Sequence, residues 1–541
     1  MNEISYLYPV KIALAEGEIE TGNSLLKTKT MQIGLGENDV ATVKGKSRIV
    51  LDFGKEVCGG VRVLMHYIND GEPVRIRFGE SLSEALTPLG VKNATNDHSP
   101  RDFAVTFSQL SDGRYGNTGF RFVCFEFTGG EYRIKSILAA CEEEKHAVIG
   151  SFSCSDPLVN EIYEVSRRTL FLCLHGGMIW DGIKRDRLVW IGDLHPETLG
   201  LLYTAGDIEN IGNCLSFAAE ETPPDGWMNG LSSYSFWWIV VLYDYYRFTG
   251  RKEVVEQHAE YLGKLIGNID RSIVEDGSTV FPSDFLDWAT SGTADAAEGV
   301  AALCGIACRR AAELLAVAGK DPSVAAKAAE KLGRRPQTEL SAKQAIAMRY
   351  LACGENGRAV GAKLTEGGAK GVSSFMSYYI LSAIGKTVGA EKAIGIMKEY
   401  YGGMLGKGAT SFWEDFDVSW INGSGRIDTL PEKGEKDIHG DYGKYCYSGF
   451  RHSLCHGWSC GPIGFLAENV LGVSVKAAGC KKIEISPDLG GLSFAEGKVP
   501  TPFGTVEISH VKTDSGIKTK IIAPKETEIV TNGCIAEISK I

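Results

Sequence analysis

The densest group of chemically active side chains lies in residues 180–197, WDGIKRDRLVWIGDLHPE. This stretch interleaves carboxylates, cations and indoles: Asp181, Asp186, Asp193, Glu197, Lys184, Arg185, Arg187, Trp180 and Trp190. Carboxylates can give and take protons, and arginines can orient neighbouring carboxylates and keep them ionised. Tryptophan faces can stack on the C–H face of a sugar ring. A solvated surface loop would not normally carry these tryptophans, so the pattern favours a site that recognises and cleaves a sugar.

A second candidate stretch, residues 408–420, reads GATSFWEDFDVSW and places Glu414 directly after Trp413. Single-displacement glycoside hydrolysis requires one carboxyl group that protonates the leaving oxygen and another that activates water on the opposite face of the ring. Glu414, which lies far from the first stretch in sequence, can supply the second group. The acidic start of a helix, which the helix dipole favours, stays open as the alternative.

Two further stretches are expected to complete the walls of a sugar-binding pocket. Trp227 lies in a Gly/Pro loop and is a better sugar platform than the tryptophans of the apolar segment that follows it. Asp287 and Trp288 end the run FPSDFLDW and are expected to form another wall. His456, beside a tryptophan, can hold a sugar hydroxyl, whereas His452 fits equally well as a core histidine satisfied by the backbone.

The pattern of apolar residues changes twice along the chain. Residues 1–150 alternate polar and apolar positions between turn residues, which predicts an antiparallel β-sandwich domain. From Asp156, which can cap a helix, the chain reads as one helix after another, so residues 151–471 predict an all-α (α/α)6 barrel as the catalytic domain. A helical solenoid is the alternative. Residues 472–541 return to β segments and predict a C-terminal antiparallel β-sandwich domain.

Composition restricts the partners. The 541 residues carry a formal net charge of -11, which disfavours nucleic acid and anionic membranes as partners. No basic stretch followed by an apolar run opens the chain, so we expect neither a signal peptide nor a membrane helix, and the 14 scattered cysteines favour a reducing cytoplasm. We therefore expect a cytoplasmic enzyme that acts on a small-molecule glycoside or oligosaccharide, with a homodimer left open.

Nothing in the sequence requires a metal or an organic cofactor, and we expect neither. Cys455 and Cys460 lie near His452 and His456 and imitate a zinc cluster, but a second paired-cysteine element is missing. The glycine-rich residues 354–371 match no phosphate-binding loop and are expected to be a loop between helices.

The carboxylate stretches resemble the signatures of the bacterial α-L-rhamnosidases of glycoside hydrolase family 78. DGIKRDRLVWIGD (181–193) is similar to Asp-Cys-Pro-x-Arg-Glu followed by Gly-Trp-x-Gly-Asp, GATSFWE (408–414) to Gly-Ala-Thr-Thr-x-Trp-Glu, and SLCHGW (453–458) to a Ser-Leu-Asn-His segment. LDFGKEVCGGVRV (51–63) is similar to the sandwich domain before the barrel. The resemblance implies an (α/α)6 barrel flanked by β-sandwich domains and exo-hydrolysis of terminal α-L-rhamnose with inversion.

The resemblance also implies roles for the matched residues. Asp186 falls on the general-acid position, and Glu414 falls on the general-base position. Asp181, Asp193 and His456 fall on sugar-binding positions. From the residue types themselves, we also expect Arg185, Trp190 and Trp413 to bind the sugar.

The sequence departs from the family pattern in two places. The acid position usually carries Glu, which is one methylene longer than Asp186, so Glu197 stays open as the acid. Gly182 and Ile183 replace the usual Cys-Pro, which indicates a divergent branch and leaves the identity of the sugar open. The alternatives are another (α/α)6 carbohydrate enzyme, either a glycosidase for a different deoxysugar or pentose or a lyase, and a non-catalytic sugar-binding protein.

Overall fold

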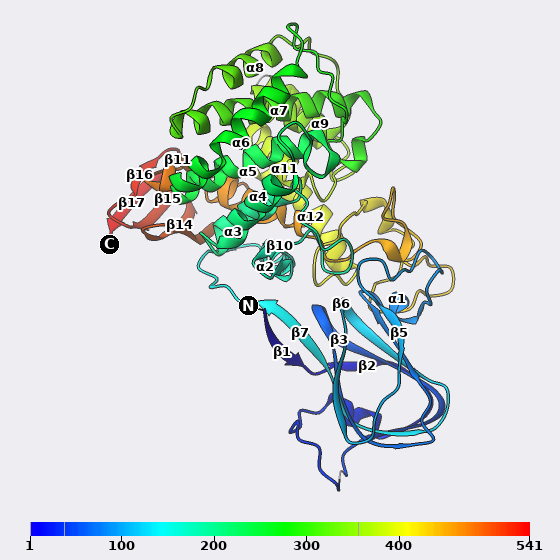
Figure 1. The fold of residues 1–541 in the computed structure, drawn as a ribbon. Helices are drawn as coiled ribbons and strands as arrows, with labels where there is room; N and C mark the ends of the chain where they lie inside the picture. Colours follow the sequence, from blue (N-terminus) through cyan, green and yellow to red (C-terminus); the bar gives the residue numbers. More distant parts are fainter. Residues whose placement is uncertain (1, 37, 355) are drawn as a thin grey trace.

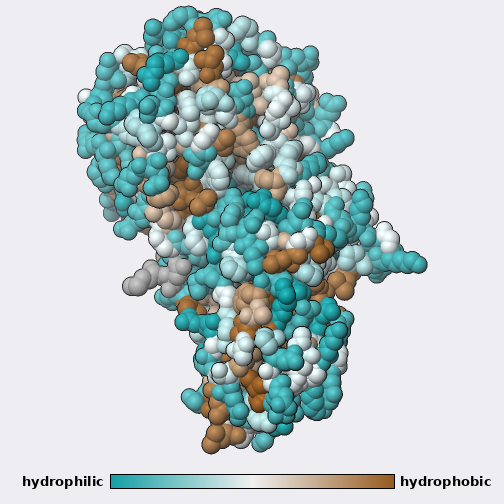
Figure 2. All heavy atoms as spheres, turned by 45° about the vertical axis from the view of Figure 1, so that its right-hand side comes forward, coloured by the Kyte–Doolittle hydropathy of each residue, from teal (hydrophilic) through white to brown (hydrophobic). Residues whose placement is uncertain are grey.

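The computed structural model describes residues 2–36, 38–354 and 356–541 and arranges them in three regions (Figure 1). Strands of the first part of the chain form one end of the molecule, the helices form the other, and the last strands lie beside the helices. On the face drawn in Figure 2, hydrophilic residues cover most of the surface and hydrophobic residues form small separate patches. No helix in the described part of the chain combines the length and the apolar character needed to cross a bilayer.

The N-terminal region is a seven-stranded sheet in which every pairing is antiparallel. Its strands are β1 (Asn2–Leu7), β2 (Lys11–Glu20), β3 (Ala41–Asn69), β4 (Val74–Gly79), β5 (Asp102–Val105), β6 (Ser111–Phe127) and β7 (Glu131–Glu144). Their spatial order is β1-β7-β3-β6-β4-β5, and β2 also pairs with β3. Val123 and Phe125 alternate along β6 and share one apolar core, because successive side chains of a strand point to opposite faces. A short helix, α1 (Leu82–Leu86), follows β4.

The helical region begins as the sequence predicts. The Asp156 carboxylate accepts a hydrogen bond from the Leu158 N–H at 3.0 Å and so caps the first long helix. The helices are α2 (Pro157–Leu172), α3 (Leu194–Thr204), α4 (Glu209–Glu221), α5 (Ser232–Thr249), α6 (Lys252–Arg271), α7 (Ala294–Val317), α8 (Ser323–Gly333), α9 (Lys343–Cys353), α10 (Gly357–Thr365), α11 (Ser377–Val388), α12 (Ala390–Gly406) and α13 (Gly461–Phe465). A small hairpin of β9 (Leu174–His175) and β10 (Met178–Ile179) follows α2.

The expectation of a loop over residues 354–371 is wrong, because this stretch contains α10. A Cβ atom added at Gly361 would lie 2.5 Å from Val388 and 2.7 Å from the hydroxyl oxygen of Thr387, both at the end of α11. Gly361 therefore permits close packing of α10 against the end of α11. In the sequence alone, a glycine that permits helix packing looks the same as a glycine of a loop.

The C-terminal strands form two sheets, and one of them also contains β8, the strand that precedes α2. One sheet contains β11 (Val473–Ala477), β12 (Lys482–Ile485) and β16 (Glu528–Thr531), and the other contains β8 (Ser151–Cys154), β13 (Phe494–Thr501), β14 (Gly504–Thr513), β15 (Gly516–Ala523) and β17 (Ile535–Lys540). The expectation of purely antiparallel strands is wrong here, since β12 pairs with β16 and β15 with β17 in parallel. Between the two strands of each parallel pair, the chain passes through one or more strands of the other sheet. It can therefore re-enter the first sheet in the same direction.

A buried ion-pair network joins the N-terminal sheet region to the helical region. The Lys184 ammonium lies 2.9 Å from the Glu80 carboxylate and 3.2 Å from the Glu84 carboxylate. Both carboxylates are fully buried, and they come from the segment after β4 and from α1. Burial raises the pKa of Glu80 to about 7 although Lys184 opposes this shift. The same Glu80 accepts hydrogen bonds from the Leu454 N–H at 2.6 Å and the Ser453 hydroxyl at 3.2 Å.

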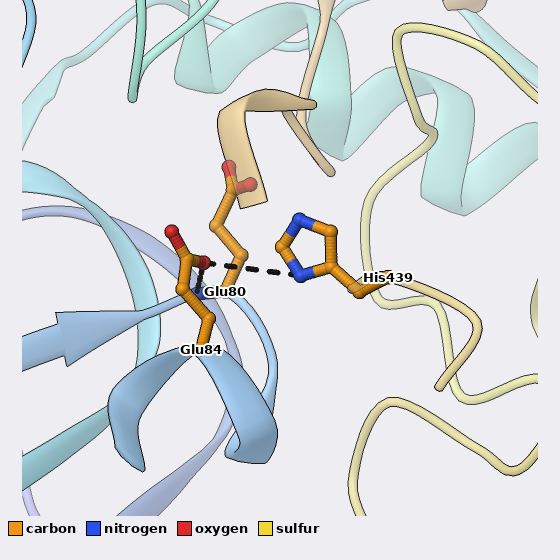
Figure 3. Close-up of side chains that lie close together, drawn as sticks. All are labelled: Glu80, Glu84 and His439. Carbon is orange, nitrogen blue, oxygen red and sulfur yellow. Dashed lines mark hydrogen bonds and ion pairs between the residues drawn. The ribbon is translucent and has the colours of Figure 1, made fainter. Parts of the chain in front are cut away.

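Figure 3 shows Glu80, Glu84 and His439 of this network, with the His439 ring facing Glu84. His439 Nδ1 lies 3.9 Å from the Glu84 carboxylate and 2.8 Å from the Ser81 hydroxyl. Burial lowers the pKa of His439 well below its usual range. Lys184 therefore supplies positive charge to both carboxylates, and the buried Arg101 guanidinium, 3.5 Å from Glu84, supplies more to Glu84.

Replacement of Lys184 by Met is expected to lower the free energy of unfolding by about 3–5 kcal/mol, because it removes the ammonium group that pairs with buried Glu80 and leaves Glu84 with Arg101. Chemical denaturation followed by circular dichroism measures the loss. Lys331→Met is the matched control: its side chain is equally buried (8% exposed, against 9% for Lys184), but its partners Asp270 and Glu275 are 24% and 67% exposed. The control should lose about 1 kcal/mol or less. Equal losses in both variants would contradict the role of the buried network.

Candidate active site

A cavity of about 260 Å³ lies among the loops and helix ends between β10 and α13. It is lined by Asp181, Arg185, Asp186, Trp190, Asp193, Asn229, Leu231, Tyr234, Phe285, Trp288, Glu414, Cys446, Tyr447, His456 and Trp458. Carboxylates thus converge with aromatic walls, and the volume lies just below the roughly 300–1,000 Å³ of pockets for drug-sized ligands. The cavity suits a single small polar ring.

The Arg185 guanidinium bridges the two carboxyl groups that the sequence assigns to catalysis. Its Nη1 lies 2.9 Å from Asp186 Oδ1, and its Nη2 donates a short hydrogen bond to Glu414 Oε1. Burial works against the charge of Arg185, but Glu414 and then Asp186 outweigh it and hold the pKa of the guanidinium above its usual range. The guanidinium also lies over the Tyr447 ring, 5.2 Å from its centroid. One buried cation therefore fixes both groups relative to each other.

Glu414 is positioned by both its side chain and its backbone. Its Oε2 accepts a hydrogen bond from the Ser453 N–H at 3.1 Å, and its main-chain carbonyl accepts one from the Trp458 indole at 2.9 Å. His456 Nδ1 lies 3.6 Å from Glu414 Oε1. The carboxyl group is buried, and it is oriented toward the cavity by donors on both oxygens.

Asp181 and Asp193 form the acidic floor of the cavity. Burial, and then its proximity to Asp193, raise the pKa of Asp181 well above its usual range, and burial does the same for Asp193. Asp181 Oδ1 accepts a hydrogen bond from the Leu188 N–H at 2.9 Å, and Asp193 Oδ2 lies 3.0 Å from His456 Nε2. Burial lowers the pKa of His456 to about 4, so this ring is neutral around pH 7. These polar groups can hold the hydroxyls of a sugar.

Asp186 lies at the rim of the cavity, with 17% of its side chain exposed. The backbone there is unusual, because Asp186 and Arg187 both have positive φ values, 55° and 61°. Residues other than glycine rarely adopt this conformation, and it persists only where the surroundings enforce it.

Two of the predicted sugar-binding tryptophans are not among the cavity-lining residues. Trp227 packs edge-on against Phe236 and Phe281, with ring centroids 6.0 Å apart in each pair. Trp413 is 1% exposed and packs edge-on against Phe416 at 5.6 Å. Trp413 belongs to the hydrophobic core of the helical region, and Trp227 packs against that core.

Two further candidate carboxyl groups, the predicted wall residue Asp287 and the alternative acid Glu197, are also not among the cavity-lining residues. Asp287 is buried, accepts a short hydrogen bond from the Ser373 hydroxyl, and has its pKa raised to about 6 by burial. Glu197, the alternative acid, is 1% exposed and is not among the residues that line the cavity. Burial raises its pKa well above the usual range, and a Cβ atom at Gly457 would lie 1.7 Å from its Oε1. Glu197 is thus enclosed by the backbone that carries His456.

Sequence reasoning missed several aromatic walls of the cavity. The Tyr234 ring meets the Trp190 ring edge-on at 6.0 Å, and the Tyr447 ring meets those of Trp288 at 5.8 Å and Trp458 at 6.2 Å. The remaining lining residues that were not predicted are Asn229, Leu231, Phe285 and Cys446. The runs that contain these residues stand out in the sequence as aromatic, but their spacing does not reveal which rings face inward.

One group in the described part of the chain could hold a metal ion by its geometry. Donor atoms of Glu80, Glu84 and His439 all lie within 4.8 Å of one another. Because the Lys184 ammonium already contacts both carboxylates, the chain itself supplies the positive charge that these ligands require.

Comparison with known proteins places the first carboxylate stretch in a described domain. The model for the bacterial alpha-L-rhamnosidase 6 hairpin glycosidase domain matches residues 147–337. The curated alpha-L-rhamnosidase of Alteromonas sp. (strain LOR) is 41% identical over 58 residues, which are 10% of this chain and 6% of that protein. The chain therefore matches only a small part of this relative.

Solved structures extend the similarity of fold to almost the whole chain. A family GH78 rhamnosidase of Bacillus sp. GL1 superposes with a TM-score of 0.76 at 21% identity, over 96% of this chain and 56% of that one. A rhamnosidase from Klebsiella oxytoca with rhamnose bound superposes with a TM-score of 0.67 at 19% identity, over 86% of this chain and 96% of that one. The resemblance indicated by the sequence motifs is confirmed: residues 147–337, which include the first carboxylate stretch, match the bacterial alpha-L-rhamnosidase 6 hairpin glycosidase domain, and the fold is similar to that of a family GH78 rhamnosidase over almost the whole chain.

Proposed function

We propose that the protein is an exo-acting, inverting glycoside hydrolase that releases terminal α-L-rhamnose from glycosides or oligosaccharides. The observation that carries the proposal is the pair of carboxyl groups, Asp186 and Glu414, on one buried guanidinium in a cavity that suits a single ring. The rhamnose named for the Klebsiella oxytoca relative and the match to the rhamnosidase domain support the choice of sugar.

The proposal includes the finer architecture. Residues 151–471 form the (α/α)6 catalytic barrel, and β-sandwich domains over residues 1–150 and 472–541 flank it. The long helices joined by site-bearing loops support the barrel, and the similarity of fold to family GH78 supports the domain order.

The mechanism is a single displacement. Asp186, at the rim, donates a proton to the glycosidic oxygen, and Glu414 takes a proton from a water molecule that attacks the anomeric carbon from the opposite face. The donors on both Glu414 oxygens, from Arg185 and the Ser453 N–H, orient this carboxyl group as an acceptor. Inversion requires the two carboxyl groups to stand roughly 6.5–9.5 Å apart in the complex with substrate.

Substrate binding is assigned to the other polar and aromatic groups of the cavity. Asp181, Asp193 and His456 hold ring hydroxyls, and Trp190 and Trp288 wall the ring. From their places behind the walls, the other predicted residues support the site without touching the sugar: Trp227, Asp287 and Trp413.

Replacement of Glu414 by Gln is expected to lower kcat on p-nitrophenyl α-L-rhamnopyranoside by about 10²–10⁴-fold, since the attacking water loses its base. Asp186→Asn should lose a similar factor on methyl α-L-rhamnopyranoside but less on the nitrophenyl substrate, whose leaving group needs little protonation. Steady-state kinetics on both substrates measure these losses. Glu432→Gln, a carboxylate on the exposed segment after Leu430, is the control and should retain full activity.

Other outcomes would change either the residue assigned as the acid or the proposed function. Full activity of Asp186→Asn on the methyl glycoside would move the acid role away from Asp186. Absence of hydrolysis by the wild type would overturn the rhamnosidase proposal; rhamnose binding without turnover would then favour a sugar-binding protein, and a product absorbing near 235 nm from uronate polymers would favour a lyase.

The first sugar released is expected to be β-L-rhamnose, because a single displacement inverts the anomeric centre. Proton NMR of the reaction in its first minutes, before mutarotation, distinguishes the two anomers. Initial release of α-L-rhamnose would contradict the roles given to Asp186 and Glu414, since retention needs a covalent nucleophile and carboxyl groups about 5–5.5 Å apart.

A further inference from the structure

The N-terminal sheet region makes hydrogen bonds to the segment that carries Asp186. The Gly119 N–H donates to the Ile183 carbonyl at 3.0 Å, and the Ser99 hydroxyl donates to the Lys184 carbonyl at 2.7 Å. The Asn117 side chain accepts a hydrogen bond from Arg187 Nη2 at 2.6 Å. Contacts thus flank Asp186 on both sides and come from the loop before β5 and from β6.

His98, in the loop between α1 and β5, contacts Asp186 itself. The Asp186 N–H donates to His98 Nδ1 at 2.6 Å. His98 itself has a φ of 64°, so a left-handed residue of the N-terminal region meets the left-handed pair Asp186 and Arg187. A hydrogen bond to the amide of a residue in this rare conformation is the kind of contact that can enforce it.

The same ring nitrogen also faces the carboxyl group. Asp186 Oδ1 lies 3.0 Å from His98 Nδ1 and 2.9 Å from Arg185 Nη1. Because Nδ1 already accepts the amide hydrogen, a neutral ring carries its own hydrogen on Nε2. The single lone pair of Nδ1 is then occupied by the amide hydrogen, so this nitrogen neither donates to nor accepts from the Asp186 carboxyl group. His98 therefore contacts Asp186 through the backbone N–H, and Arg185 contacts its carboxyl group.

We propose that His98 is a positioning residue for the general acid: its ring nitrogen accepts the hydrogen bond of the Asp186 N–H and so holds the backbone turn that directs the Asp186 carboxyl group. The inference rests on the proposed hydrolase function. The proton that reaches the leaving oxygen comes from Asp186, and His98 neither gains nor loses a proton in the step. The N-terminal region therefore acts as part of the catalytic site, although it does not line the cavity in the described residues.

The test compares two replacements of His98 on two substrates. His98→Gly removes the ring without straining the positive φ, and His98→Asn keeps a side-chain acceptor on a residue that tolerates this conformation. With methyl α-L-rhamnopyranoside, whose leaving group needs protonation, His98→Gly should lower kcat by about 10-fold or more, but by less than about 3-fold with p-nitrophenyl α-L-rhamnopyranoside. His98→Asn should recover most of the activity on the methyl glycoside.

Asn93→Gly is the matched control, because Asn93 lies in the same loop with a φ of 60° and bonds to Ser448 instead of Asp186. It should behave as the wild type on both substrates, and melting temperatures of all variants verify that they fold. Equal losses on the two substrates in His98→Gly would indicate a general structural role and overturn the proposal, as would unchanged activity on the methyl glycoside.

The same measurements separate this inference from the proposed function. If the wild type hydrolyses both substrates and Asp186→Asn shows the leaving-group dependence but His98→Gly does not, only the role of His98 is overturned. If Asp186→Asn shows no such dependence, the acid assignment falls and the role of His98 falls with it. If the wild type hydrolyses neither substrate, the hydrolase function itself is overturned.

Discussion

The contact of Arg185 with Asp186 and Glu414 is the interaction on which the site depends. It joins residues 229 positions apart in the chain and places one positive charge between two acids in a buried setting. Without this guanidinium, Glu414 would be a buried charge beside the acidic floor of Asp181 and Asp193, an arrangement that costs several kcal/mol when uncompensated. The loops of the helical region therefore have to bring Arg185 and Glu414 into contact, and the rest of the fold holds these loops in position.

Glu80 shows how the regions cooperate in that delivery. Through Lys184 it fixes the residue before Arg185, and through the Leu454 N–H it fixes the segment whose Ser453 N–H holds Glu414. One carboxylate of the N-terminal region thus connects the segments that carry Arg185 and Glu414. If the sheet region were separated from the helical region, the segments that carry Arg185 and Glu414 would both lose their contact with Glu80.

The sequence predicted the parts of this arrangement that local chemistry determines. The dense charges of residues 180–197 and the Trp413–Glu414 pair indicated the site, and the Asp156 cap marked the start of the helices correctly. The inward-facing rings could not be predicted, because Trp227 and Tyr234 lie in one aromatic run and only tertiary packing sends the first behind the wall and the second into the cavity. The parallel pairing of β12 with β16 depends on contacts far apart in sequence and leaves no local pattern.

The shorter side chain at the acid position connects these observations. An aspartate reaches one methylene less far than a glutamate, so its backbone has to approach the sugar more closely to deliver a proton at hydrogen-bond distance. The left-handed conformation at Asp186 and Arg187 sets the direction of the backbone at that point, and it is conformationally costly for residues with a Cβ atom. We infer that the contacts of the N-terminal region with residues 183–187 compensate this conformational cost. The shorter side chain of Asp186 and the contact of the sheet region with this loop therefore depend on each other.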